Sequence, residues 1–182
     1  MDISSTKALF LDRDGVINQD YGYVSQKKDF DFMDGIFHLA RSAIDKGYLI
    51  CVITNQAGIG RGYYSVEDFQ DLTDWMCGQF KKNKAEITKV YYSPYHPVHG
   101  VGEYKKDDFS RKPNPGMLLQ AQIELGINLS KSIFIGDKLT DIDAGIAAGI
   151  GKNILLTADD ESTCRKKNYF CVPSLKHSEI YL

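Results

Sequence analysis

Two aspartates near the N-terminus, Asp12 and Asp14, have the type and spacing to do chemistry together. They follow the apolar run at residues 8–11 and precede Gly15, so we expect a short buried strand that presents both carboxylates at its C-terminal edge. Open α/β sheets bind their ligands at that edge. Carboxylates this close repel each other, and a fold that presents both must relieve the repulsion with a cation, a shared proton or open water.

Mg²⁺ is the cation that we expect, because it prefers hard oxygen ligands. An aspartate can also act as a nucleophile that forms an aspartyl-phosphate, while a second aspartate supplies and removes protons. The alternative is an ordinary solvated turn, since Asp and Gly are common turn formers. Asp12 and Asp14 alone do not decide between these readings.

Three later signals also fall at the end of an expected strand or the start of an expected helix. Thr54 follows an apolar run, and its hydroxyl could bind phosphoryl oxygens, although Thr-Asn is also a common turn. Arg111 and Lys112 precede a helix start, where side-chain charge and helix dipole both attract an anion. Asp137 follows another apolar run, as Asp12 does, and could complete a magnesium site. In isolation, the basic pair could be solvated and Asp137 could be a helix cap.

Strand-length apolar runs alternate with segments of helical periodicity, which predicts a parallel sheet covered by helices. We therefore expect an α/β fold, a Rossmann-like three-layer sandwich with a mainly parallel central sheet. Ser65 and Asp68 fit a capping box, and Asn114 is expected to cap a helix that starts at Pro115. The strands are expected at residues 8–11, 48–53, 90–92, 132–135 and 153–156, and the helices at residues 35–46, 65–80, 115–125 and 140–148.

Length and composition favour one globular domain over residues 1–182, since 43% of the 182 residues are hydrophobic. The net charge of −2 has no basic run behind it, so we expect a small-molecule substrate and neither a nucleic-acid nor a membrane partner. No signal peptide or membrane-spanning segment is evident, and we expect a cytoplasmic monomer. The four cysteines are scattered without a zinc or redox pair, which predicts reduced thiols.

The order of acid pair, hydroxyl, lysine and final acid resembles the haloacid dehalogenase-like superfamily. Its four motifs match Asp12-x-Asp14, Thr54, Lys112 and Gly136-Asp137-x-x-x-Asp141. The resemblance implies that Asp12 is the nucleophile, that Asp14 is the general acid and base, and that Thr54 and Lys112 hold the transferring phosphoryl group. It also implies Mg²⁺ bound by Asp12, Asp137 and the backbone carbonyl of Asp14. Asp141 would orient Lys112.

The gaps between Asp12 and Thr54 and between Thr54 and Lys112 are too short for a sizeable cap domain, so we expect a capless, open site. Its expected walls are the loop at 91–112 and the segment at 20–28. Longer segments resemble one capless branch, the D-glycero-D-manno-heptose 1,7-bisphosphate 7-phosphatases and the related histidinol-phosphate phosphatases. These segments are residues 11–18, 20–24, 54–62, 111–117 and 136–138.

The branch resemblance implies Mg²⁺-dependent removal of the 7-phosphate of heptose 1,7-bisphosphate through an aspartyl-phosphate, in nucleotide-heptose biosynthesis. Histidinol phosphate is the alternative substrate. A catalytically idle phosphosugar-binding regulator and a phosphatase for polynucleotide ends are alternatives of other kinds. The implied substrate-binding residues are Asp20, Tyr21, Gly22, Tyr23, Asn55, Gln56, Ala57, Arg111 and Lys138.

The chain departs from this branch at a structural zinc site. The branch holds its long loop with a Cys-x-His pair and a Cys-x-Cys pair, whereas this chain has Ser93-Pro94-Tyr95 and Asp108-Phe109-Ser110. Zinc in structural sites needs thiolates or imidazoles, so we predict that no structural zinc is bound. A rearranged site that uses His96 and His99 with Asp107 and Asp108 is the less favoured alternative.

Overall fold

The computed structural model describes residues 6–158 and 168–182. Within them lies one six-stranded sheet of order β3-β2-β1-β4-β5-β6, in which every neighbouring pair is parallel. The expected α/β sandwich with a parallel central sheet is therefore confirmed. The strands are β1 (Lys7–Leu11), β2 (Tyr48–Asn55), β3 (Lys89–Ser93), β4 (Ile133–Gly136), β5 (Lys152–Leu156) and β6 (Phe170–Val172).

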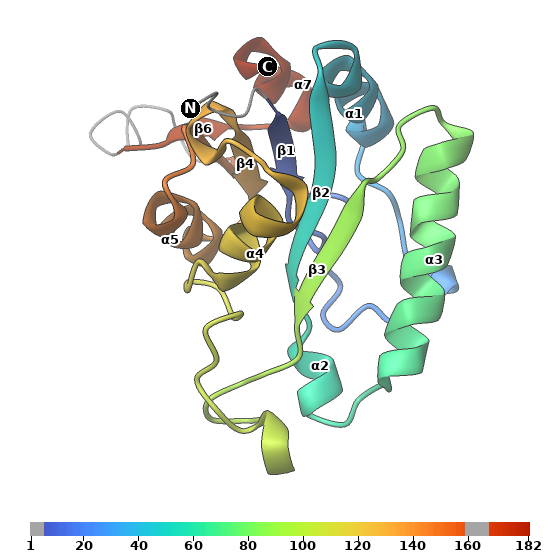
Figure 1. The fold of residues 1–182 in the computed structure, drawn as a ribbon. Helices are drawn as coiled ribbons and strands as arrows, with labels where there is room; N and C mark the ends of the chain where they lie inside the picture. The colour runs from blue at the N-terminus through green and yellow to red at the C-terminus, as the bar shows by residue number, and fades with distance from the viewer. Residues whose placement is uncertain (1–5, 159–167) are drawn as a thin grey trace.

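Helices cover both faces of the sheet, with α1 and α3 on one face and α4 and α5 on the other (Figure 1). Strand β1 contributes side chains to the apolar core on both faces of the sheet. Leu9 and Leu11 pack on the face covered by α1 and α3, and Ala8 and Phe10 pack on the face covered by α4 and α5. The α-helices are α1 (Ile36–Asp45), α2 (Ala57–Gly60), α3 (Val66–Lys82), α4 (Gly116–Leu125), α5 (Leu139–Ala148) and α7 (Leu175–Ser178). The 3₁₀ turns are η1 (Lys27–Asp29), η2 (Gly102–Tyr104), η3 (Leu129–Lys131) and η4 (Glu179–Tyr181).

The two helix starts with expected caps differ in outcome. Ser65 and Asp68 form the expected capping box, because the Asp68 amide donates to Ser65 Oγ at 3.0 Å and the Ser65 amide donates to Asp68 Oδ2 at 2.8 Å. The expected cap at Asn114 is wrong, since α4 begins at Gly116 with Pro115 before it. The side-chain Nδ2 of Asn114 instead donates to the Asp108 carbonyl at 3.1 Å and holds the preceding loop in place.

The cysteines only partly follow the expectation of reduced thiols. Cys51 and Cys77 are free, but Cys171 is disulfide-bonded, so the expectation is wrong there. Cys164 lies outside the described residues. Among residues 6–158 and 168–182, no helix combines the length and apolarity that a membrane span requires.

The strand order places the site. After β1 the chain crosses over to β2 on one side, and after β4 it crosses over to β5 on the other side. Where two neighbouring parallel strands are followed by crossovers in opposite directions, a crevice forms beyond their carboxyl ends. Asp12 follows β1 and Asp137 follows β4, and the Asp12 amide donates to the Ile135 carbonyl at 3.0 Å. The two aspartates of the first and last motifs are therefore brought to one edge by sheet register.

Two helical glycines give a test of this packing. In α5, a Cβ on Gly145 would overlap Asn153 Oδ1 and lie 3.2 Å from the Phe134 ring. In α3, a Cβ on Gly78 would meet nothing within 4 Å. Because alanine favours helix by about 0.5–1 kcal/mol, Gly78→Ala should raise the free energy of unfolding by that amount. Gly145→Ala should lower it by about 1–3 kcal/mol, as overpacking does. Denaturant titration of both variants checks this, and a stabilised Gly145→Ala would contradict the described contact of α5 with β5.

Candidate functional site

Asp12 and Lys112 form a buried ion pair at the end of β1. The Lys112 ammonium lies 2.8 Å from Asp12 Oδ1, 2.6 Å from Asp141 Oδ1 and 2.8 Å from the Ile53 carbonyl oxygen. These three acceptors match the three protons of the ammonium. Burial alone would lower the pKa of Lys112, but the charges of Asp12 and Asp141 outweigh it and raise that pKa. Lys112 therefore stays charged, and Asp141 lies where the expected role of orienting Lys112 requires.

The electrostatics of Asp12 call for more positive charge than Lys112 supplies. Burial raises the pKa of Asp12 to about 8; Lys112 opposes this rise, whereas the neighbouring Asp141 and Asp14 carboxylates add to it. A carboxylate is a nucleophile only when it is ionised. A bound cation at this position would stabilise the ionised form.

Asp14 has a set of hydrogen-bond donors separate from the partners of Asp12. Arg13 Nη2 donates to its Oδ1 at 2.9 Å, Asn18 Nδ2 donates to the same oxygen at 3.1 Å, and Gln56 Nε2 donates to Oδ2 at 3.1 Å. Arg13 is itself fully buried and also donates to the Val24 carbonyl at 2.7 Å. The two carboxylates of the Asp12-x-Asp14 pair are thus held in different environments, which allows them different protonation roles.

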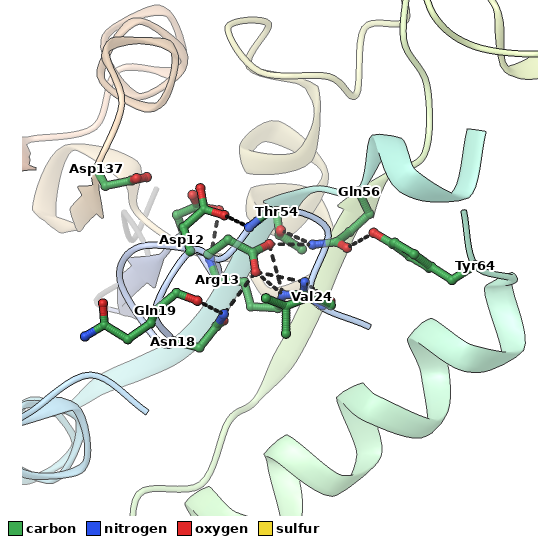
Figure 2. A network of polar contacts seen from close by, with 12 residues as sticks. Asp12, Arg13, Asn18, Gln19, Val24, Thr54, Gln56, Tyr64 and Asp137 are labelled. Carbon is green, nitrogen blue, oxygen red and sulfur yellow. Dashed lines mark hydrogen bonds and ion pairs between the residues drawn. The ribbon is translucent and has the colours of Figure 1, made fainter. Parts of the chain in front are cut away.

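Gln56 links Asp14 to Thr54 and Tyr64 (Figure 2). The Tyr64 hydroxyl donates to Gln56 Oε1 at 2.6 Å, and Gln56 Nε2 donates to Thr54 Oγ1 at 2.7 Å as well as to Asp14. Burial raises the pKa of Tyr64 to about 12, so the phenol keeps its proton and fixes the direction of the amide. The Thr54 side chain is buried, and its position depends on this network.

Asp137 completes a cluster of acidic side chains. One oxygen from each of Asp12, Asp137 and Asp141 lies within 4.8 Å of the others, and this is the one such group of metal-ligating side chains in the described residues 6–158 and 168–182. Asp137 Oδ1 is buried without a hydrogen-bond partner. A Cβ on Gly15 would overlap the Asp137 carboxylate, and Gly15 has a φ of 93°, so a glycine there permits the close approach. An orphaned carboxylate oxygen beside an ionisable Asp12 fits a hard cation such as Mg²⁺.

The residues of the first, third and fourth motifs open into one cavity of about 410 Å³. Most of the predicted site residues line it; Thr54, Tyr21 and Asp137 do not. Thr54 is buried, whereas Tyr21 is exposed and donates from its hydroxyl to Asp31 Oδ2 at 2.9 Å. The lining residues are Asp12, Asp14, Asp20, Gly22, Tyr23, Asn55, Gln56, Ala57, Tyr64, Arg111, Lys112, Lys138, Thr140 and Asp141.

The walls of this cavity are more extensive than expected. Residues of 20–28 and of 91–112 line it, but Tyr64 and Thr140 line it too and were missed from the sequence. Thr140 lies in the first turn of α5, directly after a matched motif, and that position was an available signal. No sequence signal pointed to Tyr64, because its ring reaches the cavity wall by packing closely against Gly58.

Three basic side chains line the cavity, and Arg61 lies close to its lining residue Tyr23. The Lys138 ammonium lies 2.9 Å from Asp20 Oδ2; burial lowers the pKa of Lys138, but this hydrogen bond and the charge of Asp137 outweigh burial and raise it. Arg61 hydrogen-bonds the Tyr23 hydroxyl, and its guanidinium lies over the Tyr23 and Tyr63 rings. Lys112, Lys138 and Arg111 give the cavity the charge that an anionic substrate needs.

Comparison with known proteins gives close relatives. A family model described as HAD-hydrolase-like matches residues 109–176. The D-glycero-alpha-D-manno-heptose-1,7-bisphosphate 7-phosphatase of Burkholderia mallei is 54% identical over 86% of this chain and 82% of its own length. The D-glycero-beta-D-manno-heptose-1,7-bisphosphate 7-phosphatase of Vibrio cholerae is 47% identical over 82% of this chain and 80% of its own length.

Solved structures share the fold. A HAD-like phosphatase from Mesorhizobium loti superposes with a TM-score of 0.80 at 35% identity, over 85% of this chain and 74% of that one. D,D-heptose 1,7-bisphosphate phosphatase from B. bronchiseptica, complexed with magnesium and phosphate, superposes with a TM-score of 0.82 at 22% identity over 97% of both chains.

Removing a carboxylate charge should have opposite effects at two neighbouring positions in metal-free protein. Burial raises the pKa of Asp137, and its Oδ1 is unpartnered, so Asp137→Asn removes an unfavourable charge. We expect its Tm to rise by about 2–4 °C, the equivalent of roughly 1 kcal/mol. Asp141 accepts from the Lys112 ammonium and, at 3.0 Å, from the Lys138 amide, so Asp141→Asn should cost about 1–3 kcal/mol. Thermal melts after dialysis against EDTA measure the Tm of both variants. A change of Tm in the same direction in the two variants would contradict this assignment of charge.

Proposed function

Because the chain belongs to the D-glycero-D-manno-heptose-1,7-bisphosphate 7-phosphatase family of haloacid dehalogenase-like hydrolases, we propose that it removes the 7-phosphate of heptose 1,7-bisphosphate and releases inorganic phosphate. The observation that carries this proposal is the pairing of that family membership with two separately held carboxylates, Asp12 and Asp14, that line one cavity. We also propose that residues 1–182 act as one catalytic domain and as a monomer. The meeting of Asp12, Lys112 and Asp141 at one edge of a single sheet supports one catalytic domain.

Asp12 and Asp14 divide the chemistry between them. A carboxylate oxygen of Asp12 attacks phosphorus, and the bond between phosphorus and the sugar oxygen breaks as Asp14 gives that oxygen a proton. Asp14, now ionised, removes a proton from water, and the resulting hydroxide attacks the aspartyl-phosphate and releases Asp12 and phosphate. The Arg13, Asn18 and Gln56 donors hold Asp14 in the orientation that both steps need.

Lys112 and Thr54 act on the charge of the transferring group. The Lys112 ammonium already contacts Asp12 at 2.8 Å, so it lies next to the atom that forms the new bond. A positioned donor aimed at developing negative charge contributes about 3–4 kcal/mol to the transition state. Thr54 Oγ1 accepts from Gln56 Nε2 at 2.7 Å, and its hydroxyl is expected to face the oxygens of the transferring group.

Mg²⁺ fits the acidic end of the cavity. The residues that would hold it are Asp12, Asp137 and the backbone carbonyl of Asp14. When bound, the ion supplies positive charge that offsets repulsion between an anionic nucleophile and an anionic substrate. The unpartnered oxygen of Asp137 supports this assignment.

The remaining lining residues suit the rest of a sugar bisphosphate. Arg111 and Lys138 place two further cations at the wall and can recognise the second phosphate, and Tyr23 presents an aromatic ring to the sugar. The predicted binding residues Asp20, Gly22, Asn55, Gln56 and Ala57 line the same cavity and can hydrogen-bond sugar hydroxyls through side chains or backbone.

A substrate panel tests the proposed activity. Purified protein with Mg²⁺ should release phosphate from heptose 1,7-bisphosphate with a kcat/KM well above that for histidinol phosphate. Both anomers belong in the panel, because the relatives include enzymes named for each. Asp12→Asn should be inactive, since it lacks the nucleophile. A protein inert toward every bisphosphate, or an active Asp12→Asn variant, would refute the proposed mechanism.

Binding of Mg²⁺ should depend on pH in a defined direction. In the metal-free protein the pKa of Asp12 is raised to about 8, so protons compete with the metal below that pH. The folded state binds this proton more tightly than the unfolded chain does. Its contribution to the stability of the metal-free fold is therefore full below about pH 4 and is lost as pH rises from about 4 to about 8. The Mg²⁺-induced rise in Tm should therefore be larger at pH 8 than at pH 6. In Asp12→Asn this pH dependence should largely vanish; its persistence would argue against Asp12 as a ligand.

A further inference from the structure

The loop between β3 and α4 differs from the related branch at the four positions where that branch carries zinc ligands. Ser93, Tyr95, Asp108 and Ser110 occupy them here. No thiolate or imidazole is among them, and both oxygens of Asp108 already have partners in Ser110 and Lys106. This donor set does not fit structural zinc.

The nearby histidines do not replace the missing ligands. His96 Nδ1 accepts from the backbone amides of Val98 at 3.2 Å and His99 at 3.0 Å, which occupies that nitrogen within its own turn. His96 and His99 belong to no cluster of three metal-ligating side chains in residues 6–158 and 168–182. A rearranged zinc site therefore has no support in the described part of the chain.

A chain of hydroxyls lies where the branch carries metal ligands. Ser110 Oγ lies 2.6 Å from Asp108 Oδ1 and 2.9 Å from Ser93 Oγ. A carboxylate can only accept, so the Ser110 proton goes to Asp108 and Ser93 donates to Ser110. Ser93 is completely buried at the end of β3, where an unpaired hydroxyl would be costly.

Lys106 brings the positive charge that a metal would otherwise bring. Its ammonium lies 2.9 Å from Asp108 Oδ2 and 4.1 Å from the centre of the Tyr95 ring. It therefore joins the two halves of the loop, one leaving β3 and the other approaching α4. We call Ser93, Tyr95, Lys106, Asp108 and Ser110 together the loop clasp.

The loop clasp has direct connections to the cavity. The Arg111 amide donates to the Asp108 carbonyl at 2.9 Å, and Arg111 Nη1 donates to the Tyr95 carbonyl at 2.9 Å. Both halves of the clasp thus fix the one arginine that follows it, and Arg111 lines the cavity. The Ser93 carbonyl also accepts from the backbone amide of Gln56 at 2.7 Å, and the side chain of Gln56 is one of the donors that orient Asp14.

The tip of the loop is held separately. The Val101 amide donates to the Gly60 carbonyl of α2 at 2.8 Å, and the His96 amide donates to the Tyr104 carbonyl at 3.0 Å. These bonds involve none of the clasp side chains. The clasp therefore acts at the base of the loop, where Arg111 emerges.

We propose that the loop clasp replaces the structural zinc of the related branch, so that hydrogen bonds and the Lys106 charge hold the base of this loop and position Arg111 for the substrate. The effect on substrate recognition rests on the proposed phosphatase activity; the metal-independence of the loop does not. Lys106, Asp108 and Ser110 are positioning residues, since none of them lines the cavity.

Metal content and stability test the metal-free clasp without any substrate. Elemental analysis of the purified protein should find far less than one zinc per chain. Treatment with a zinc-selective chelator in the presence of excess Mg²⁺ should leave both Tm and activity unchanged. One tightly held zinc per chain, or a fall in Tm on chelation, would overturn the proposal.

Variants test the positioning of Arg111. Asp108→Ala should raise KM about 3- to 10-fold, the size expected for lost hydrogen bonds, with kcat within twofold of wild type. Ser110→Ala should do the same to a smaller extent, and Ser110→Thr, which keeps the hydroxyl, should restore the wild-type KM. Glu103→Ala, an exposed acid of the same loop, is the matched control and should change neither constant. An unchanged KM in Asp108→Ala would refute the role in positioning.

Hydrogen exchange separates this proposal from the activity itself. Amides at the base of the loop, in residues 93–95 and 106–112, should exchange faster in Asp108→Ala than in wild type, while amides of β1 and β4 should not change. This result would support the clasp even if the substrate panel found no activity; equal exchange would refute the clasp even if the panel succeeded. The quadruple variant S93C/Y95H/D108C/S110C should bind one zinc per chain, and a folded variant that binds none would show that the clasp does not occupy the place of the metal.

Discussion

Mutual repulsion among carboxylates is the constraint around which the rest of this site is built. Asp12, Asp14, Asp137 and Asp141 meet at one edge of the sheet, and a fold can hold them there only if each has a counterpart. Lys112 serves Asp12 and Asp141, and buried Arg13 serves Asp14. Asp137 alone keeps a buried oxygen without a partner, which is why the cation belongs there. This distribution of positive charge is compatible with the proposed roles of nucleophile, proton carrier, metal ligand and orienting residue.

Sheet topology turns a one-dimensional motif order into this cluster. Residues far apart in the chain become neighbours because β1 and β4 are adjacent and parallel, and β2 pairs with the other side of β1. Alternating apolar runs predicted five strands and the helices between them, because long periodic segments carry a strong signal. Strand β6 was missed because it has only three residues and depends on β5 for its pairing.

The site was predictable where chemistry is carried by motif residues, and less so where it depends on packing. Asp12, Asp14, Lys112 and Asp141 are close neighbours in space, as their strand-end and helix-start positions suggested. Tyr64 was not predictable, since its contribution arises from the contact of its hydroxyl with Gln56. The start of α4 was misplaced by one residue because the Asn114 side chain has another partner, the Asp108 carbonyl, that competes with its capping role. Local sequence rules fail where a side chain finds a better partner outside the helix that it was expected to cap or pack within.

The three partners of Lys112 have a further consequence for turnover. With its protons directed at Asp12, Asp141 and the Ile53 carbonyl, this ammonium has no free proton for an incoming phosphoryl oxygen. It can bind that oxygen only by giving up one internal partner, so part of the attraction for phosphate is offset by the bond that is lost. The same exchange runs in reverse after hydrolysis, when the internal partner competes with inorganic phosphate for the ammonium. A fully occupied lysine thus limits how tightly the site holds its product while leaving it able to respond to charge that develops during the reaction.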